Sequence, residues 1–436
     1  MSFRNTEIGK LPSEWDVKTL KECSTKITDG THSTVKDNKD GEYYLLSCKN
    51  VKNGNVVLGE KERKIDLDTL KKLRKRTNMD IGDLLLTTVG TIGESAIVKD
   101  LNFEFQRSVA IIKLDTKKVN KNFAYYITKD RYFKYQVSGR ISGSVQKCLY
   151  LGDINNIKIP LPSLAEQKAI AKILSDLDEK IEVNNKINKN LEEMAQAIFK
   201  QWFVDFEFPN EEGKPYKSSG GEMVESELGI IPKGWNCGLI ENIATVIGGA
   251  TPSKKNESYF INGNIPWVTP KDLSDNKNIY ISKGTTNITK EAYKSTSVKF
   301  MPRNTVLFSS RAPIGYIAIA KNELTTNQGF KSLVPNNDIG MTANYIYCFL
   351  KSIKKSIENR ASGSTFKEIS GSELKKIEVI IPAKGILQKY YKFTENIFWE
   401  IENIESENER LEKLRDNLLP KLMSGEIRVP LENNEN

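Results

Sequence analysis

The most informative part of the sequence is the run over residues 163–202, SLAEQKAIAKILSDLDEKIEVNNKINKNLEEMAQAIFKQW. It begins with a capping-box pattern, in which the Ser163 hydroxyl and the Glu166 carboxylate can satisfy free N–H groups of a helix's first turn. Apolar residues then recur at alternating steps of three and four, which is typical of a coiled-coil seam. The seam residues are Ile170, Leu174, Leu177, Ile181, Leu191, Ala195, Ile198 and Trp202, and Asn184 and Asn188 interrupt them.

A second run near the end of the chain repeats this seam in the same register, at Tyr390, Thr394, Ile397, Ile401, Ile404, Asn408, Leu411, Arg415, Leu418 and Leu422. A helix of about 40 residues rises about 60 Å, which is long for an ordinary surface helix. A buried asparagine costs stability but fixes helix register. We therefore expect two long helices that pack antiparallel as a spacer, with their register set by Asn188 and Asn408. In the alternative interpretation, each helix lies on its own globular module.

The rest of the chain repeats in the same way. The matching pairs are LPSEW at 11–15 with IPKGW at 231–235, LLLTT at 84–88 with VLFSS at 306–310, IG at 92–93 with IG at 314–315, and SGS at 142–144 with SGS at 362–364. All pairs follow in order, and the spacing between partners is nearly constant. The sequence therefore predicts a tandem duplication.

Each half combines short β-branched and aromatic runs with a long helical pattern. The predicted fold class is α+β, with two mixed α/β globular modules joined by two long antiparallel coiled-coil helices in a pseudo-twofold arrangement. The expected boundaries are 1–162 for the first module, 163–207 for the central helix, 208–224 for a linker, 225–382 for the second module, 383–425 for the distal helix and 426–436 for a tail.

Composition restricts the class of protein. Lys and Arg number 65 against 56 Asp and Glu, and the resulting net charge of +9 permits long-range attraction to nucleic acid. No run approaches the roughly 18 apolar residues of a membrane span. The N-terminal residues lack the apolar core of a signal peptide. We expect a soluble protein of the cytoplasm.

Motifs for catalysis are absent from the sequence. No window fits the phosphate-binding pattern G-x-x-x-x-G-K-[ST], and no Pro-Pro pair exists to form an amino-methyltransferase loop. The five cysteines lie far apart, and His32 is the only histidine. The nearest imitation of a metal nuclease is Asp205 with Glu212 and Lys214, but these residues fall in the predicted linker. We expect no catalytic residue and no bound metal in this chain.

Charged and polar loops remain as candidate DNA contacts. Arg can bond two acceptors of guanine, Gln can bond two groups of adenine, and Lys neutralises phosphate. Arg311 stands where the first half has Val89, so it is a candidate specific to the second module. The candidates are His32, Lys49, Arg63, Lys64, Lys72, Arg74, Arg76, Gln106, Arg107, Arg140, Ser142, Ser144, Gln146, Lys147, Lys254, Lys255, Lys271, Arg311, Gln328, Arg360, Ser362, Ser364 and Lys367. Solvated helix faces and ordinary surface turns are the alternative interpretation.

Taken in order, these motifs resemble the specificity subunit (HsdS) of type I restriction-modification systems. The resemblance spans nearly the whole chain. It rests on both Trp-ending motifs, on GDLLLTTVGTIG at 82–93, on IPLPSLAEQ at 159–167 and on LLPKLMSGEI at 418–427. The second half departs from the pattern at 384–387, where KGIL replaces the LAEQ of 164–167, so its helix start is less well defined.

The resemblance implies that each module reads one half of a split, asymmetric DNA site. The two helices would set the unread gap and dock two methyltransferase subunits, and two restriction subunits would complete the nuclease. It also implies that S-adenosylmethionine is bound by the methyltransferase subunit, and that ATP and Mg²⁺ serve the assembly, with no cofactor bound by this chain. A free-standing two-module DNA-binding regulator or architectural protein is the alternative, and a nuclease built on Asp205, Glu212 and Lys214 ranks third.

Overall fold

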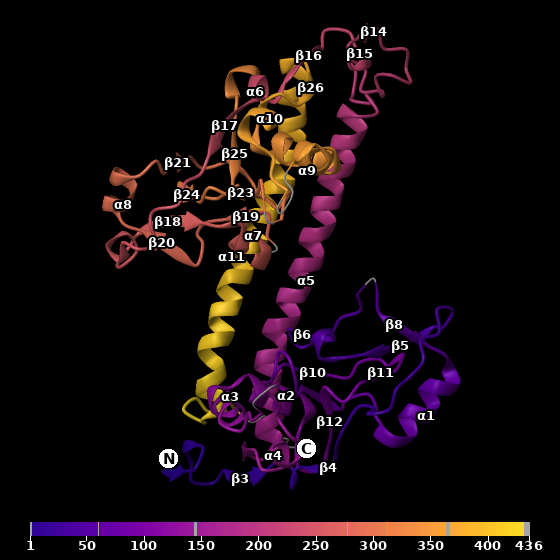
Figure 1. The fold of residues 1–436 in the computed structure, drawn as a ribbon, viewed down its shortest axis with the longest axis vertical. Helices are drawn as coiled ribbons and strands as arrows, with labels where there is room; N and C mark the ends of the chain where they lie inside the picture. The colour runs from indigo at the N-terminus through magenta and orange to yellow at the C-terminus, as the bar shows by residue number, and fades with distance from the viewer. Residues whose placement is uncertain are drawn as a thin grey trace. The chain divides into compact units, whose positions relative to one another are not determined.

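The computed structural model describes residues 2–59, 61–143, 146–276, 278–311, 313–362 and 367–430 (Figure 1). The chain forms two compact units. Unit 1 comprises Met1–Ile181 and Arg410–Asn436, and unit 2 comprises Glu182–Glu409. Each unit contains one mixed module and parts of two long helices, α5 (Leu164–Phe203) and α11 (Lys384–Met423). The predicted fold class, two modules and two long helices from a tandem duplication, is confirmed.

The module of unit 1 is built on a four-stranded antiparallel sheet in the order β10-β9-β12-β4. Its strands are β4 (Ser24–Asp29), β9 (Leu84–Thr87), β10 (Ser95–Ile97) and β12 (Val109–Leu114). The strand at 84–87 consists of three leucines and a threonine and is wholly buried, as expected for a central strand. A smaller sheet in the order β11-β5-β8 consists of β5 (Tyr43–Leu46), β8 (Arg63–Ile65) and β11 (Phe103–Phe105).

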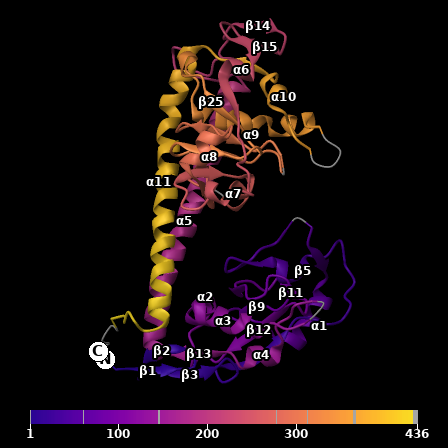
Figure 2. The ribbon, with the colours of Figure 1, turned by 60° about the vertical axis from the view of Figure 1, so that its left-hand side comes forward.

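Helices and short strand pairs complete unit 1. Helices α2 (Lys121–Lys129) and α3 (Arg131–Ser138) follow one another (Figure 2), and α2 packs against β9 and β10. The remaining elements are α1 (Leu67–Thr77), α4 (Leu151–Asn155), a 3₁₀ turn (Cys48–Asn50), and the pairs β1 (Phe3–Thr6) with β2 (Gly9–Pro12), β3 (Asp16–Thr19) with β13 (Lys158–Leu161), and β6 (Val51–Lys52) with β7 (Asn55–Val56).

Unit 2 repeats this plan with a larger main sheet in the order β17-β25-β22-β23-β19. Its strands are β17 (Ala244–Gly248), β19 (Tyr280–Ile281), β22 (Val306–Phe308), β23 (Ile317–Ala320) and β25 (Lys331–Pro335). The second sheet, β20-β18-β24-β21, consists of β18 (Ile265–Val268), β20 (Thr286–Ile288), β21 (Phe300–Met301) and β24 (Leu324–Thr326). In both units, the smaller sheet contains a parallel pair, β11 with β5 and β18 with β24.

Further helices, turns and strand pairs complete unit 2. They are α6 (Ile240–Ile243), α7 (Pro270–Asp275), α8 (Lys290–Ser295), α9 (Ala343–Arg360), α10 (Gly371–Lys375), 3₁₀ turns at Glu257–Tyr259 and Asn337–Ile339, and the pairs β14 (Met223–Ser226) with β15 (Gly229–Pro232) and β16 (Asn236–Leu239) with β26 (Glu378–Ile381). In both units, a strand of a two-stranded pair ends directly before the long helix, β13 before α5 and β26 before α11.

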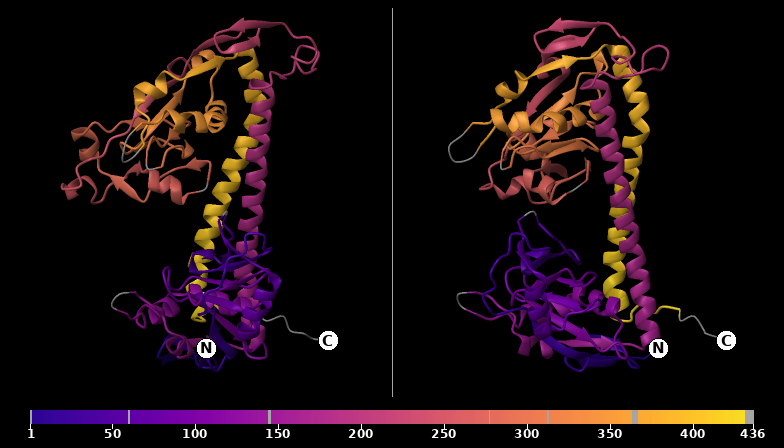
Figure 3. Two further views of the ribbon diagram at one scale, coloured as in Figure 1. Left: turned by 45° about the vertical axis from the view of Figure 1, so that its right-hand side comes forward. Right: turned by 90° about the vertical axis from the view of Figure 1, so that its right-hand side faces the viewer.

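The long helices pack antiparallel within each unit. In unit 1, Arg415 of α11 donates to Asp178 of α5 at 2.7 Å. In unit 2, both views of Figure 3 show the two helices side by side, and the ring centroids of Trp202 and Tyr390 lie 5.8 Å apart. Seam residues such as Leu174, Ala195 and Ile401 are fully buried, because apolar side chains at heptad spacing face the partner helix.

Of the two asparagines predicted to set the helix register, Asn408 makes hydrogen bonds to the facing helix and the Asn188 Oδ1 makes none to a described residue. Asn408 accepts a hydrogen bond from Asn184 at 2.8 Å, and it donates to Asn185 at 2.9 Å. Asn188, which was predicted to share this role, has a buried Oδ1 with no partner among the described residues. The repeat explains the difference: Asn408 is equivalent to Asn188, but an antiparallel pair brings non-equivalent positions together, and the equivalent of Asn184 is Ile404.

The segment predicted as a linker, 208–224, takes part in the core of unit 2. Phe208 is 4% exposed, and its ring stacks on Tyr216 at 4.5 Å and on Trp235 at 5.2 Å. The turn-forming composition hid this role, because a few aromatic side chains suffice to anchor an irregular segment. No helix in the described part of the chain is long and apolar enough to cross a lipid bilayer.

Candidate nucleic-acid interface

In unit 2, the segment that follows β22 extends to Arg311 and meets a second segment there. Arg311 forms an isolated antiparallel bridge with Glu368, and Glu368 forms another with Ser362. Next to this bridge, the Ile369 N–H donates to the carbonyl of Ser310 at 3.1 Å. These backbone contacts hold the loop after α9 against the end of the main sheet.

Unit 1 contains the same backbone arrangement. Val89 bridges Cys148, Cys148 bridges Ser142, and the Leu149 N–H donates to the carbonyl of Thr88 at 2.9 Å. We call this arrangement the bridge frame, defined by residues 88–89, 142 and 148–149 in unit 1 and by residues 310–311, 362 and 368–369 in unit 2. Each bridge frame includes the first serine of an SGS motif that the sequence identified as a candidate contact.

The side chains on the bridge frame differ between the units. In unit 2, Arg311 Nη1 lies 3.5 Å from Glu368 Oε2, and Lys331 Nζ lies 3.5 Å from Glu368 Oε1. The side chains of Arg311 and Glu368 are 36% and 35% exposed. In unit 1, uncharged Val89 and Cys148 occupy the positions of Arg311 and Glu368. The two modules therefore present different chemistry on one backbone arrangement.

A second loop lies against a strand end in unit 1. Thr31 bridges Gln106, and the Arg107 N–H donates to the Thr31 carbonyl at 3.0 Å. His32 Nε2 lies 2.6 Å from Asp29 Oδ2. The structure thus brings together three predicted contacts, His32, Gln106 and Arg107, from two distant parts of the sequence.

The corresponding loop of unit 2 follows β17. The Ala250 N–H donates to the carbonyl of Thr326 at 3.0 Å, which places the loop beside the turn that contains Gln328. Gln328, Lys254 and Lys255 are all exposed. The predicted polar contacts of the second module therefore lie on an accessible loop and an accessible turn.

Several cations of the first module that were predicted to contact DNA form ion pairs inside the module instead. Arg74 pairs with Glu104 at 2.7 Å, and Glu104 is fully buried. Burial raises the pKa of the Glu104 carboxyl, although the hydrogen bonds from Arg74 and Thr77 oppose this. Arg76 pairs with Asp29 at 2.7 Å and also donates to the Asp29 backbone carbonyl. The sequence could not reveal these partners, because each carboxylate comes from a distant strand.

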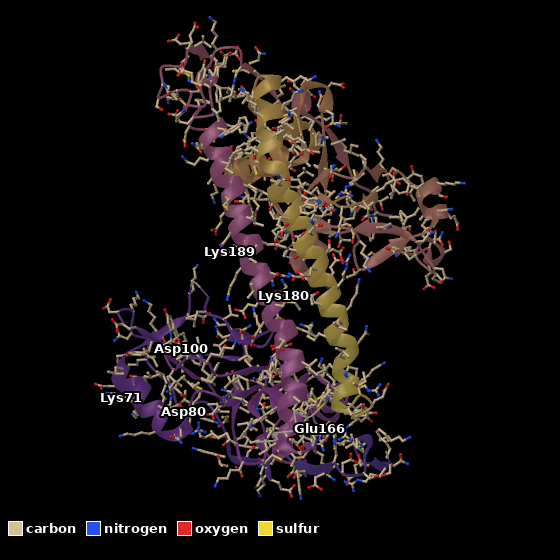
Figure 4. The ribbon with its side chains drawn as sticks, turned by 180° about the vertical axis from the view of Figure 1, so that it is seen from behind. Lys71, Asp80, Asp100, Glu166, Lys180 and Lys189 are labelled. Atoms are coloured by element: carbon tan, nitrogen blue, oxygen red, sulfur yellow. The ribbon has the colours of Figure 1, made fainter. Side chains whose placement is uncertain are left out.

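Other cations of this stretch have weaker attachments. Arg63 pairs with Asp37 at 2.7 Å, and Lys49 pairs with Glu62 at 3.1 Å, with both cationic side chains over a third exposed. Figure 4 shows Lys71 on α1. The exposed side chains of Lys64 and Lys72 form no ion pair with a described residue. Among the predicted contacts of this stretch, they are the cations with no ion pair to a described residue.

The remaining predicted residues divide into three groups. Arg140 is half-buried and donates to the carbonyl of Gln136 at 3.0 Å, which favours a structural role. Ser144 and Ser364 lie outside the described residues. The others are exposed: Ser142, Gln146, Lys147, Lys271, Arg360, Ser362 and Lys367. No group of three His, Cys, Asp or Glu side chains among the described residues is arranged to hold a metal ion.

Sequence reasoning missed Glu368 and Lys331. Their link to Arg311 depends on three separate segments, and nothing in the local sequence around Glu368 distinguishes it from an ordinary surface acid. Only the mismatch with the first half, where Cys148 stands at the position of Glu368, could have drawn attention to it.

Buried polar contacts fix each module to the long helices of its own unit. In unit 2, the Glu405 carboxylate of α11 accepts the N–H groups of Ile279 and Tyr280 at 2.6 and 3.0 Å. Burial raises the pKa of Glu405 to about 8, against the opposing effect of these two donors. Tyr347 donates to Glu192 of α5 at 2.7 Å. Both helices therefore hold this module.

Unit 1 uses different residues for the same purpose. Tyr126 donates to Asp178 of α5 at 2.7 Å, and Asp178 also accepts from Arg415 of α11. At the first turn of α5, where Figure 4 labels Glu166, the Glu166 carboxylate accepts from Trp15 at 3.0 Å and from Arg428 at 2.6 Å. The residues after α11 are thereby tied to the first module.

This architecture defines a class of protein: a duplicated chain with two modules of one fold, differing side chains on the same frame, and two shared helices. Comparison with known families agrees with it. The family model for the type I restriction modification DNA specificity domain matches residues 12–193 and again residues 232–413. The second match is offset from the first by the spacing that separates Trp15 from Trp235. The chain belongs to this family, and it is a type I restriction-modification specificity subunit.

Individual relatives are similar over different parts of the chain. The type I restriction enzyme MjaIX specificity subunit of Methanocaldococcus jannaschii is 44% identical over 195 residues, which is 44% of this chain and 44% of that protein. The MjaX protein of the same organism is 28% identical over 446 residues, 98% of this chain and 97% of that protein. The HindI specificity subunit of Haemophilus influenzae is 27% identical over 348 residues, 68% of this chain and 74% of that protein.

A solved structure shares the fold. The crystal structure of the S subunit of a type I restriction-modification system from M. genitalium superposes with a TM-score of 0.56. The comparison covers 94% of this chain and 96% of that chain, at 18% identity. At this identity, the likeness concerns the fold alone.

Proposed function

We propose that each module of this chain reads one half of a bipartite, asymmetric DNA site for a type I restriction-modification complex. The observation that carries the proposal is the repeated DNA specificity domain, whose two copies share the bridge frame but differ in the side chains on it. One backbone arrangement with two sets of contacts suits a site whose two halves differ in sequence. Base contacts then supply specificity, and exposed Lys and Arg supply phosphate contacts.

In this proposal, the two long helices set the gap between the half-sites and dock two methyltransferase subunits. Two restriction subunits complete the assembly that cuts DNA. S-adenosylmethionine belongs to the methyltransferase subunit, ATP and Mg²⁺ serve the complex, and this chain binds none of them and has no catalytic residue. The complex works in the cytoplasm, where the DNA is. The predicted boundaries 1–162, 163–207, 208–224, 225–382, 383–425 and 426–436 describe the parts in this scheme.

Selection of bound sequences from a random DNA library tests the proposal. The complex of this chain with the methyltransferase subunit of its system is expected to select two short motifs separated by a fixed number of unselected base pairs. The chain alone, as a control, is expected to bind more weakly. Tight and sequence-specific binding by the chain alone would instead support a free-standing regulator, and a single continuous motif would contradict the two-module reading.

A further inference from the structure

In unit 2 the bridge frame carries Arg311 and Glu368, and Lys331 of β25 contacts Glu368; the equivalent positions of unit 1 carry no charge. Two hydrogen bonds relate the positions: the Ser310 N–H donates to Gly329 at 2.8 Å, and the Thr88 N–H donates to Ser108 at 3.0 Å. The acceptors Gly329 and Ser108 are therefore equivalent. Lys331 follows Gly329 by two residues and Ala110 follows Ser108 by two, so Lys331 corresponds to Ala110. The trio Arg311, Glu368 and Lys331 therefore replaces Val89, Cys148 and Ala110.

Resting on the proposed function, we infer that Arg311 reads a guanine in the half-site of the second module, and that Glu368 and Lys331 position it. The guanidinium is planar and presents paired donors, which match the O6 and N7 acceptors of guanine in the major groove. Arg311 is partly exposed in the segment that follows β22, and backbone bonds join this segment to Glu368 and Ile369. It is thus accessible to DNA, and its backbone is held by the bridge frame.

Glu368 restricts the conformations of Arg311 before DNA binds. A free arginine side chain loses rotamer freedom on binding, and this loss weakens association. The contact between Glu368 Oε2 and Arg311 Nη1, at 3.5 Å, is long enough to be a loose restraint rather than a tight ion pair. Arg311 can therefore exchange its carboxylate partner for a base at a small cost.

Lys331 makes this exchange possible. It contacts the other oxygen of Glu368, Oε1, and its side chain is only 18% exposed. When Arg311 turns to a base, Lys331 remains as the counter-ion of Glu368. Without Lys331, the exchange would leave an unpaired carboxylate near the DNA phosphates, which repel it. The trio has two cations and one anion, so it attracts DNA both before and after the exchange.

Substitutions in the full chain, bound to its methyltransferase subunit, test the inference by selection from a DNA library. Arg311→Ala is expected to lower the preference for guanine at one position of the second half-site by roughly 5- to 150-fold, with the first half-site unchanged. Arg311→Lys, which keeps the charge but not the paired donors, is expected to lose the same preference. Arg107→Ala is the matched control in the first module, and it leaves the second half-site unchanged.

Variants of the other two residues test their positioning role. Glu368→Gln is expected to weaken the preference for guanine and to raise affinity for unrelated DNA, because a negative charge is lost. Lys331→Met is expected to reduce affinity for the selected site about tenfold, and Lys331→Arg to restore it. Denaturant unfolding of each variant verifies that the fold is intact.

The outcomes separate the inference from the proposed function. Equal loss of affinity by Arg311→Ala on selected and shuffled DNA would make Arg311 a phosphate contact and overturn the inference, as would an unchanged motif. An unchanged motif in both Glu368→Gln and Lys331→Met would overturn their positioning role. Failure of the wild-type complex to select any split motif would instead contradict the proposed function itself.

Discussion

At the scale of single residues, Glu405 is the most unusual acid of unit 2. It is 3% exposed and makes hydrogen bonds to two backbone N–H groups, yet burial dominates and raises its pKa to about 8. A protonated carboxyl cannot accept both donors as well as a carboxylate. Ionisation therefore improves these two hydrogen bonds but buries a charge, and the cost of the buried charge is larger, so ionisation of Glu405 weakens the attachment of the second module to α11.

Glu405 predicts a pH dependence of stability. In the unfolded chain it ionises near pH 4.5, and in the folded chain near pH 8, so its contribution is fully present below pH 4.5 and is lost as pH rises to 8. The loss is at most about 5 kcal/mol. Relative to Glu405→Gln, the wild-type free energy of unfolding is expected to fall between pH 5 and 8 in urea titrations. A difference that stays constant with pH would contradict the shifted pKa.

Glu166 provides a second prediction at this scale. Its carboxylate is 4% exposed and shares hydrogen bonds with Trp15 and Arg428. Removal of one partner leaves a buried charge poorly compensated, so Arg428→Ala is expected to lower the free energy of unfolding by about 3 kcal/mol. Glu14→Gln removes only an exposed contact to Arg428 and is the control, expected to change little. If Arg428→Ala and Glu14→Gln lowered the free energy of unfolding by the same amount in chemical denaturation, the role of the buried carboxylate would be contradicted.

Residue roles were the part of the molecule least accessible from sequence. The sequence identified Arg74 and Arg76 by charge alone, but the structure pairs them with Glu104 and Asp29. The sequence identified Arg311 because each position in one half of a duplicated chain can be compared with its equivalent in the other half, and the equivalent of Arg311 is Val89. It could not identify Glu368 as the partner, since a contact between distant segments leaves no local pattern.

At the scale of elements, the long helices are encoded by their own spacing of apolar residues. The predicted ranges 163–207 and 383–425 differ only slightly from the observed Leu164–Phe203 and Lys384–Met423. The missing capping box did not displace the second helix, because β26 ends directly before it, as β13 does before α5. The register, by contrast, depends on which faces meet, and the sequence pointed to Asn188 where the structure uses Asn184.

The asparagine contact between the helices predicts a contrast between variants. Asn408→Leu removes one of the two acceptors of the buried Asn184 amide, the other being the Glu407 carboxylate, so it is expected to lower the free energy of unfolding by about 1 to 3 kcal/mol. The double variant Asn184→Leu with Asn408→Leu replaces both partners and is expected to recover this loss. The free energies of unfolding of the wild type, the single variant and the double variant are to be measured from urea unfolding curves.

Asn188→Leu is the matched control, since the Asn188 Oδ1 is buried with no partner among the described residues. It is expected to be neutral or stabilising. Destabilisation by Asn188→Leu as large as that by Asn408→Leu would show that Asn188 contributes to the register after all.

At the scale of the whole molecule, the chain is one ancestral plan used twice. The two domain matches, the bridge frames and the strand before each long helix all recur. The clearest differences at shared positions lie in side chains: Arg311 and Glu368 against Val89 and Cys148, and Glu405 against Asn185 at the equivalent helix position. Because the backbone plan is shared, specificity can change in one module without changing the other.

The most direct test of independent reading by the two modules is an exchange of one module. The chain is co-expressed with its methyltransferase subunit, and methylated adenines are mapped across the genome by sequencing. For the wild-type chain we predict a split motif with a fixed gap. Residues 1–162 are then replaced by the corresponding module of another specificity subunit. This exchange is expected to change one half of the motif and to leave the other half and the gap unchanged. A change in both halves, or a motif that does not respond to the exchange in a folded complex, would contradict independent reading by the two modules.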